Sequence, residues 1–229
     1  MGNDFKFNIG GVTNWYDRFV AADIELISAY IEQCEISNTI AIQEYHKLKT
    51  IETEEVEGYI PTFKISFRDI DGSLFNPQDI YENVFPMLNR HSTLVIVMSM
   101  FEERLKQLCD WTDSHFAIRV SFKKKGSLIF NIKTYLMETI KLEFSDELKE
   151  GWNELIVLQS IRNNIVHNFG KYETKNHYID AFINSNKNIA INESNEFVFN
   201  HEFLKDLVPN FNRLCIGLQN AIRNKSSNS

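Results

Sequence analysis

Apolar residues recur every three or four positions along much of the chain, and this spacing is typical of helices that bury one face. Residues 87–111 are apolar on more than one face, which predicts a central helix. Residues 39–57 have the weakest helical pattern and end in an acidic run. The helices predicted from the spacing cover residues 15–34, 39–57, 87–111, 127–140, 145–169 and 201–222.

Shorter stretches alternate apolar and polar residues, as strands do when one face is buried. Residues 63–68 predict a strand that ends at Asp71-Gly72. Residues 187–191 and 196–199 predict a hairpin around a turn at 192–195. The sequence thus predicts an all-α fold, mainly a helical bundle, with a small β-hairpin before the last helix.

The same pattern suggests how the chain is divided. We interpret residues 1–78 as a mostly helical N-terminal extension, residues 79–225 as a helical domain and residues 226–229 as a disordered tail. The length of 229 residues suits one large domain with such an extension. Only 9 glycines and 4 prolines occur, which argues against an all-β or loop-dominated fold.

Composition indicates a cytoplasmic protein that does not enter membranes. The longest apolar run, residues 94–98, is far shorter than the ~20 residues needed to cross a bilayer. The N-terminal residues lack a basic region followed by an apolar stretch, so we expect no signal peptide. The 3 cysteines are widely spaced, as reduced thiols are. No metal-ligand spacing or glycine-rich phosphate loop occurs, so we expect neither a metal nor a cofactor.

Polar residues are concentrated at the end of the predicted 145–169 helix, in the stretch IRNNIVHNFGKY at 161–172. Ser145 is the expected N-cap, with two acidic residues in the first turn, where the helix dipole favours negative charge. Gly170 is the expected C-cap. An arginine, two amides and a histidine therefore fall in the last two turns of a helix that otherwise resembles core.

Helical geometry separates these side chains into two directions. Asn163 and His167 are four residues apart and share a face. Arg162 lies about 140° around the helix from His167, close to the apolar stripe of Leu158 and Ile165. An arginine there must snorkel, pair with an acid or meet a partner chain. The long guanidinium could wrap around the helix toward His167, or a second copy of the helix could complete one site across a two-fold axis. The divergent directions are better explained by the second copy, which predicts a homodimer.

The chemistry of these side chains fits RNA cleavage. Imidazole can take a proton from a ribose 2′-hydroxyl or donate one to a leaving 5′-oxygen near neutral pH. A guanidinium can hold the scissile phosphate and stabilise its additional negative charge. We therefore expect His167 to be the general base or acid, Arg162 the phosphate clamp and Asn163 the orienting residue, with no metal required.

Arg162-Asn163-x-x-x-His167 resembles the Arg-x(4–6)-His motif of HEPN domains, where a polar residue commonly follows the arginine. A Phe-Glu-x-x-Leu element at 101–105 precedes it, as in many HEPN proteins, and a predicted hairpin and terminal helix follow. The resemblance covers about residues 80–225. The N-terminal 78 residues have no counterpart in it.

The resemblance implies an all-helical, usually dimeric, metal-independent endoribonuclease that acts on RNA as a toxin, in phage defence or in RNA processing. Arg162 and His167 of two subunits would meet in one cleft, and an antitoxin or regulatory protein would be a partner. Some HEPN toxins carry a tyrosine two residues after the histidine, which a partner enzyme modifies. Here that position is Phe169, which puts such neutralisation in doubt.

Other interpretations remain open. The motif would also suit a helix end whose polar groups satisfy nearby carbonyls, a non-catalytic HEPN-like module that binds RNA, a nucleotide or a protein, or a plain helical scaffold. Glu103 is a candidate supporting acid or a solvated surface residue. The net charge of −7 and pI of about 5.4 argue against a broad nucleic-acid surface. The candidate RNA-binding lysines are Lys123, Lys124, Lys125 and Lys171.

Overall fold

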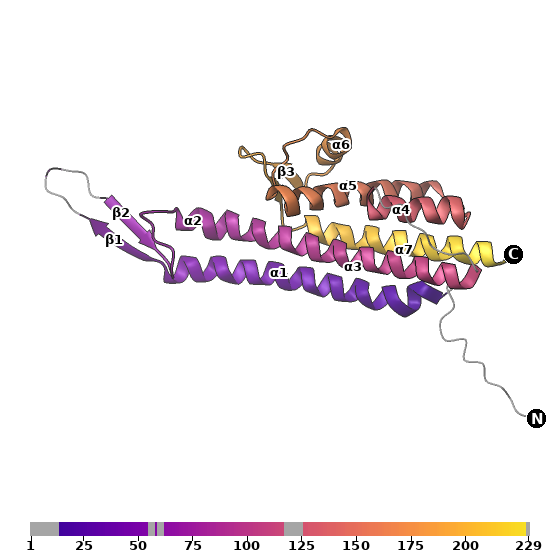
Figure 1. The fold of residues 1–229 in the computed structure, drawn as a ribbon. Coiled ribbons are helices and arrows are strands. Elements are labelled where there is room, and N and C mark those ends of the chain that lie inside the picture. The colour runs from indigo at the N-terminus through magenta and orange to yellow at the C-terminus, as the bar shows by residue number, and fades with distance from the viewer. Residues whose placement is uncertain (1–13, 55–57, 59–61, 117–125, 228–229) are drawn as a thin grey trace, which may run out of the picture. The chain divides into compact units, whose positions relative to one another are not determined.

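The computed structural model describes residues 14–54, 58, 62–116 and 126–227. The chain is mainly helical, with two small antiparallel hairpins, one of them directly before the last helix (Figure 1). This confirms the predicted fold class. Within the described residues, no helix is long and apolar enough to cross a membrane.

The chain forms two compact units, which divide it at points other than residue 78. Unit 1 consists of residues 1–29 and 94–229, and unit 2 consists of residues 30–93. The helices α1 (Ala21–Leu48) and α3 (Phe85–Phe116) contribute to both units.

Unit 1 is a helical bundle with a hairpin. Its remaining elements are η2 (Tyr16–Val20), α4 (Leu128–Thr134), η4 (Tyr135–Thr139), α5 (Asp146–Asn168), α6 (His177–Ser185), β3 (Ile189–Ile191), β4 (Phe197–Phe199) and α7 (Phe203–Ser227). The rings of Phe101 on α3 and Phe211 on α7 stack with their centroids 4.6 Å apart. Leu158 of α5 and Leu105 of α3 are also fully buried. This apolar core fixes α3, α5 and α7 against one another.

Side-chain caps begin α4, α5 and α6 of unit 1. The hydroxyl of Ser145 accepts a hydrogen bond from the N–H of Leu148 at 3.2 Å, as predicted. Ser127 caps α4 in the same way. The amide oxygen of Asn176 accepts from the N–H of Tyr178 and begins α6, a short helix that was not predicted. α7 continues to Ser227, so residues 226 and 227 are helical, contrary to the predicted tail.

Unit 2 contains a β-hairpin and the helix segments beside it. Its elements besides α1 and α3 are β1 (Thr50–Glu54), β2 (Thr62–Ser66), α2 (Pro77–Asp79) and η3 (Ile80–Val84). Its core is a cluster of three buried aromatic residues, Tyr45, Phe67 and Tyr81. Tyr45 and Tyr81 stack with their centroids 5.4 Å apart. The guanidinium of Arg90 is bound by both carboxylate oxygens of Glu35 at 2.7 Å.

The predicted helix over 39–57 is wrong in its second half. α1 runs without interruption from the region predicted as 15–34 and ends at Leu48. Strand β1 follows, and it pairs with β2 so that Ile51 lies opposite Ile65. Glutamates favour helix locally, but the β-branched residues of β1 alternate with them and hydrogen-bond to a strand far along the chain. Pairing across the hairpin overrides the local preference.

Candidate functional site

The candidate motif occupies the last two turns of α5, where the helix ends differently from the prediction. Phe169, not Gly170, is the first residue with a left-handed backbone, at φ 54°. Gly170 follows with φ 81°. The N–H groups of both residues donate to the carbonyl of Asn164, so two residues together close the helix.

The segment after α5 is tied to the β3–β4 hairpin. The carbonyl of Gly170 accepts a hydrogen bond from the N–H of Phe197 at 3.0 Å. The N–H of Tyr172 donates to the carbonyl of Asn195 at 2.7 Å, and its hydroxyl donates to the carboxylate of Asp180 on α6 at 2.9 Å. The hairpin and α6 therefore hold the end of the motif helix in place from outside the bundle.

Arg162 is bound from two sides within unit 1. One terminal nitrogen, Nη1, donates to the amide oxygen of Asn163 at 3.0 Å. The other, Nη2, lies 3.4 Å from a carboxylate oxygen of Glu102 on α3. The two charged side chains are only 21% and 13% exposed, so their attraction is weakly screened by solvent. These contacts fix the plane of the guanidinium.

Glu102 is the acid that supports Arg162, whereas Glu103 fits the second of its two interpretations, a solvated surface residue. Glu103 is 67% exposed and pairs with Lys106 in its own helix. The sequence contains the signal for this choice, because position 102 falls in the buried stripe that also carries Met98 and Leu105. An acid in such a stripe requires a buried partner.

Glu102 is bound in turn by Gln159, which is itself bound by Ser127. The amide nitrogen of Gln159 donates to its second carboxylate oxygen at 2.9 Å. The hydroxyl of Ser127, the N-cap of α4, donates to the amide oxygen of Gln159. A chain of polar contacts therefore runs from α4 through α5 and α3 back to Arg162, and we call it the Ser127–Arg162 network. Sequence reasoning missed both Gln159 and Ser127 as parts of it.

His167 stands apart from this network. It is exposed, and within the described ranges its side chain forms no hydrogen bond or ion pair. It shares a helix face with Asn163, four residues before it. Asn163, which shares this face, is the residue through which the motif binds the guanidinium of Arg162.

The other amides of the motif behave as a helix end does. The side chain of Asn164 donates to the carbonyl of Ser160 at 2.9 Å, and that of Asn168 donates to Asn164 at 3.3 Å. The structure thus divides the motif into two sets. The side chains of Asn164 and Asn168 satisfy groups at the helix end, whereas in the described part of the chain the side chains of Arg162, Asn163 and His167 bind no backbone carbonyl.

The predicted RNA-binding lysines are only partly described. Lys171 is exposed directly after the motif, and its side chain makes no ion pair in the part of the chain that the structure covers. Lys123, Lys124 and Lys125 lie outside the described residues.

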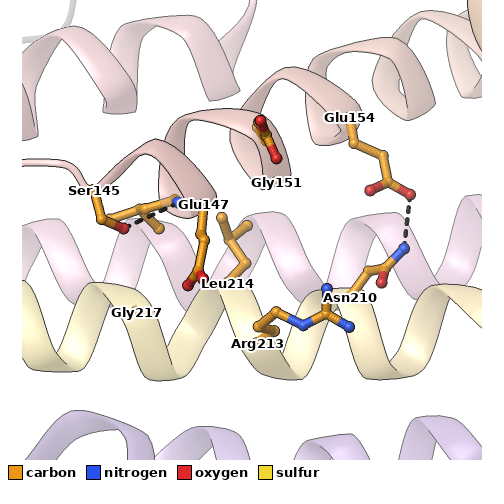
Figure 2. A pocket seen from close by; sticks show the side chains of 10 residues that line it. Ser145, Glu147, Gly151, Glu154, Asn210, Arg213, Leu214 and Gly217 are labelled. Atoms are coloured by element: carbon orange, nitrogen blue, oxygen red, sulfur yellow. Dashed lines mark hydrogen bonds between the residues drawn. The ribbon is translucent and has the colours of Figure 1, made fainter.

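A groove of about 380 Å³ runs between the first half of α5 and α7 (Figure 2). Glu154 reaches across it from α5 to the side chain of Asn210 on α7 at 2.8 Å. Three glutamates, at 147, 150 and 154, face one arginine, Arg213. An excess of carboxylates repels phosphate, so this groove does not suit an RNA backbone. It is also separate from the motif, which occupies the opposite end of α5.

Two glycines allow α5 and α7 to approach closely beneath this groove. A Cβ atom on Gly151 of α5 would lie 3.3 Å from a methyl carbon of Leu214 on α7. A Cβ atom on Gly217 of α7 would lie 3.3 Å from a methyl carbon of Leu148 on α5. Each leucine therefore sits in a notch left by the glycine of the other helix.

Among the residues that the structure describes, no three His, Cys, Asp or Glu side chains gather as a metal site would require. Comparisons with protein-family models, with curated proteins and with solved structures found no match to the chain. The resemblance to HEPN domains therefore rests on the motif and its surroundings in the sequence.

Proposed function

We propose that this protein is a metal-independent endoribonuclease of the HEPN type that acts as a homodimer. The observation that carries the proposal is that Glu102 and Asn163 together bind the guanidinium of Arg162, while Asn163 shares a helix face with His167. A motif that only ended a helix would not need an arginine held by a half-buried acid, followed five residues later by an exposed histidine whose side chain has no partner in the described chain.

Arg162 retains donors for a substrate. A guanidinium has five N–H groups. Asn163 and Glu102 each accept from one of the two terminal nitrogens, and Nε is buried without a partner in the described structure. One N–H on each terminal nitrogen stays uncommitted, which is the pair that a phosphate takes in a bidentate contact. Glu102 and Asn163 would then orient the plane, and the phosphate would bind its outer edge.

His167 supplies the proton transfers of the proposed reaction. As general base it takes the proton of the ribose 2′-hydroxyl, and the oxygen attacks the adjacent phosphorus. The bond from phosphorus to the 5′-oxygen breaks, and that oxygen receives a proton from a general acid. The products are a 2′,3′-cyclic phosphate and a free 5′-hydroxyl. Arg162 stabilises the negative charge that builds on the phosphate oxygens.

A second copy of the chain supplies the second histidine. One chain carries a single His167, whereas the reaction needs a base on one side of the phosphorus and an acid on the other. Two copies related by a two-fold axis would present both histidines and both arginines to one phosphate. Activity of this kind fits a toxin or a phage-defence protein that a partner restrains.

The test is cleavage of total RNA with EDTA present. Wild-type protein is expected to cut RNA and to leave 2′,3′-cyclic phosphate ends, as measured by mass spectrometry. His167→Ala and Arg162→Ala are expected to lose at least about 100-fold of the rate, the usual contribution of one such group. His201→Ala is the matched control, because His201 is an exposed histidine of the same unit. This variant should cleave RNA at the wild-type rate.

Each result has a defined meaning for the proposal. Absence of cleavage by a folded wild-type dimer, or equal cleavage by His167→Ala, would overturn it. RNA binding without cleavage would instead support a non-catalytic binding module. Induction in a bacterial host, scored for growth arrest in wild type against His167→Ala, addresses the toxin role separately.

A further inference from the structure

Phe169 combines two features that seldom occur together. Its ring is 91% exposed, the largest exposed fraction among the large hydrophobic residues described. Its backbone lies in the left-handed region, at φ 54°. A bulky residue in this region is an outlier, because its Cβ crowds the neighbouring carbonyl oxygen, and such outliers point toward functional sites.

Neither folding nor capping requires a phenyl ring at this position. The ring buries almost no surface, so it contributes little to the core. Closure of the helix depends on backbone N–H groups that donate to Asn164, and glycine would adopt the same conformation without strain. The side chain is therefore unfavourable for the isolated subunit on two counts.

The backbone around Phe169 is nevertheless held firmly. Asn164 binds it from the helix, and the next residue, Gly170, is bonded to Phe197 of β4. The ring thus projects from a fixed point two residues after His167. An exposed aromatic side chain with no polar atom, carried by a fixed backbone, can recognise the face of another flat ring.

The charge of the protein makes such a contact important for RNA. At a net charge of −7, neutralisation of phosphates supplies little affinity over most of the surface. Stacking on an aromatic side chain binds a base without requiring positive charge. Bases in an A-form duplex are stacked on one another, so only an unpaired base offers its face.

We infer that Phe169 is the stacking platform of the site and takes an unpaired base next to the scissile phosphate. This inference rests on the proposed function. The alternative for an exposed apolar ring is a contact with the second copy of the chain, and the two are separated by the variant Phe169→Gly.

The experiment measures binding of an unpaired RNA oligonucleotide by fluorescence anisotropy, in the His167→Ala background so that the RNA stays intact. Phe169→Gly is expected to weaken binding roughly tenfold, and Phe169→Trp is expected to restore it. An RNA with an abasic nucleotide beside the mapped cleavage position should bind the protein that retains Phe169 about tenfold more weakly. The same RNA should cause no further loss of affinity in Phe169→Gly. The fully paired duplex should bind all variants equally.

The stability of Phe169→Gly is an independent control, because it should stay the same or increase while the RNA affinity falls. Glycine relieves the left-handed strain, so the melting temperature of Phe169→Gly should equal or exceed that of its parent. Unchanged RNA affinity, or a loss that comes with dissociation of the dimer and a lower melting temperature, would overturn the inference. If wild-type protein cleaves RNA and Phe169→Gly cleaves it equally well, only this inference fails. If wild type does not cleave, the proposed function fails instead.

Discussion

The two units of the chain bury their apolar residues to different degrees. Of the 17 large hydrophobic residues that are exposed in the described chain, 10 lie in unit 2, although it spans only residues 30–93. Unit 1 encloses a core among its helices, and unit 2 relies on three aromatic rings. The candidate site lies on unit 1, where buried side chains position Arg162 through the Ser127–Arg162 network. Precise placement of polar groups requires side chains that are locked by closed packing. The core of unit 2 is less closely packed in this sense.

Thiol reactivity should give the largest difference between the units. Burial raises the pKa of the Cys109 and Cys215 thiols of unit 1, so little thiolate forms at pH 8 and reagents have no access. Cys34 of unit 2 is half-buried. We expect iodoacetamide to label Cys34 at least about 1000-fold faster, because the other two thiols react only after the core opens. Mass spectrometry of timed samples measures these rates. Equal labelling of all three would mean that unit 1 is no better closed than unit 2.

Truncation of one aromatic side chain in each core should have the second-largest effect, which is a loss of stability. Phe101→Ala removes a ring stacked in unit 1 and should cost about 3–5 kcal/mol of unfolding free energy. Tyr81→Ala removes a ring stacked in unit 2, and we expect it to raise amide exchange within residues 30–93 only. Urea unfolding and hydrogen exchange measure these effects.

The control for that pair is RNA cleavage at a temperature where both variants stay folded. Tyr81→Ala should retain the wild-type rate, because its ring belongs to the cluster of unit 2. Increased exchange throughout residues 145–170 in Tyr81→Ala would contradict the independence of the two units.

A matched pair of glutamates tests the site itself. Glu102 and Glu35 each hold an arginine, and the two pairs are similarly buried, with exposed fractions of 13% for both glutamates. Glu102→Gln and Glu35→Gln should each lower the unfolding free energy by about 1 kcal/mol, because the amide keeps one hydrogen bond and loses the charge.

Only Glu102→Gln should also slow RNA cleavage, by roughly tenfold, since the guanidinium plane loses part of its support. Glu102→Asp should be intermediate. The informative readout is kcat in Mg²⁺-free buffer. A purely structural role would be indicated if both glutamine variants cleaved RNA at the same rate.

The smallest expected effect is the loss of stability at low pH that Asp71 of unit 2 causes. The N–H and hydroxyl of Ser73, with Lys64, hold the pKa of Asp71 at about 2, below its ordinary value of 3.8. The ionised form is therefore favoured by folding, and its stabilising contribution is present above pH 3.8 and is lost as the pH falls toward 2. Wild type and Asp71→Asn should differ slightly in melting temperature at pH 5.5 and converge near pH 2. A difference that persists at pH 2 would exclude this linkage.

Elements with local signals could be predicted from the sequence. The spacing of apolar residues and the cap at Ser145 were sufficient for α5, and the turn at 192–195 was sufficient for the β3–β4 hairpin. β1 was missed because its strand conformation depends on pairing with β2 farther along the chain, which no short window contains. α6 is a single short helix whose only buried residue is Ile179, so its pattern was too brief to recognise.

The candidate site was predictable in its types of residue but not in its contacts. Asn163 and His167 followed from helical spacing alone. The support of Arg162 did not, because it comes from α3 and α4 and depends on which of two adjacent glutamates faces the core. The unusual backbone of Phe169 was also hidden, since the glycine after it carries the stronger local signal for a helix end.

The two glycine notches between α5 and α7 restrict how the site could be regulated. Many helix pairs change state by sliding one turn past each other. A slide of one turn would move Leu148 and Leu214 away from the two glycines and toward neighbouring positions that carry side chains. The packing of the two leucines against the two glycines therefore opposes such a slide of α5 along α7. This packing favours control of the motif by a molecule that approaches it from outside over control by a shift of the helix that bears it.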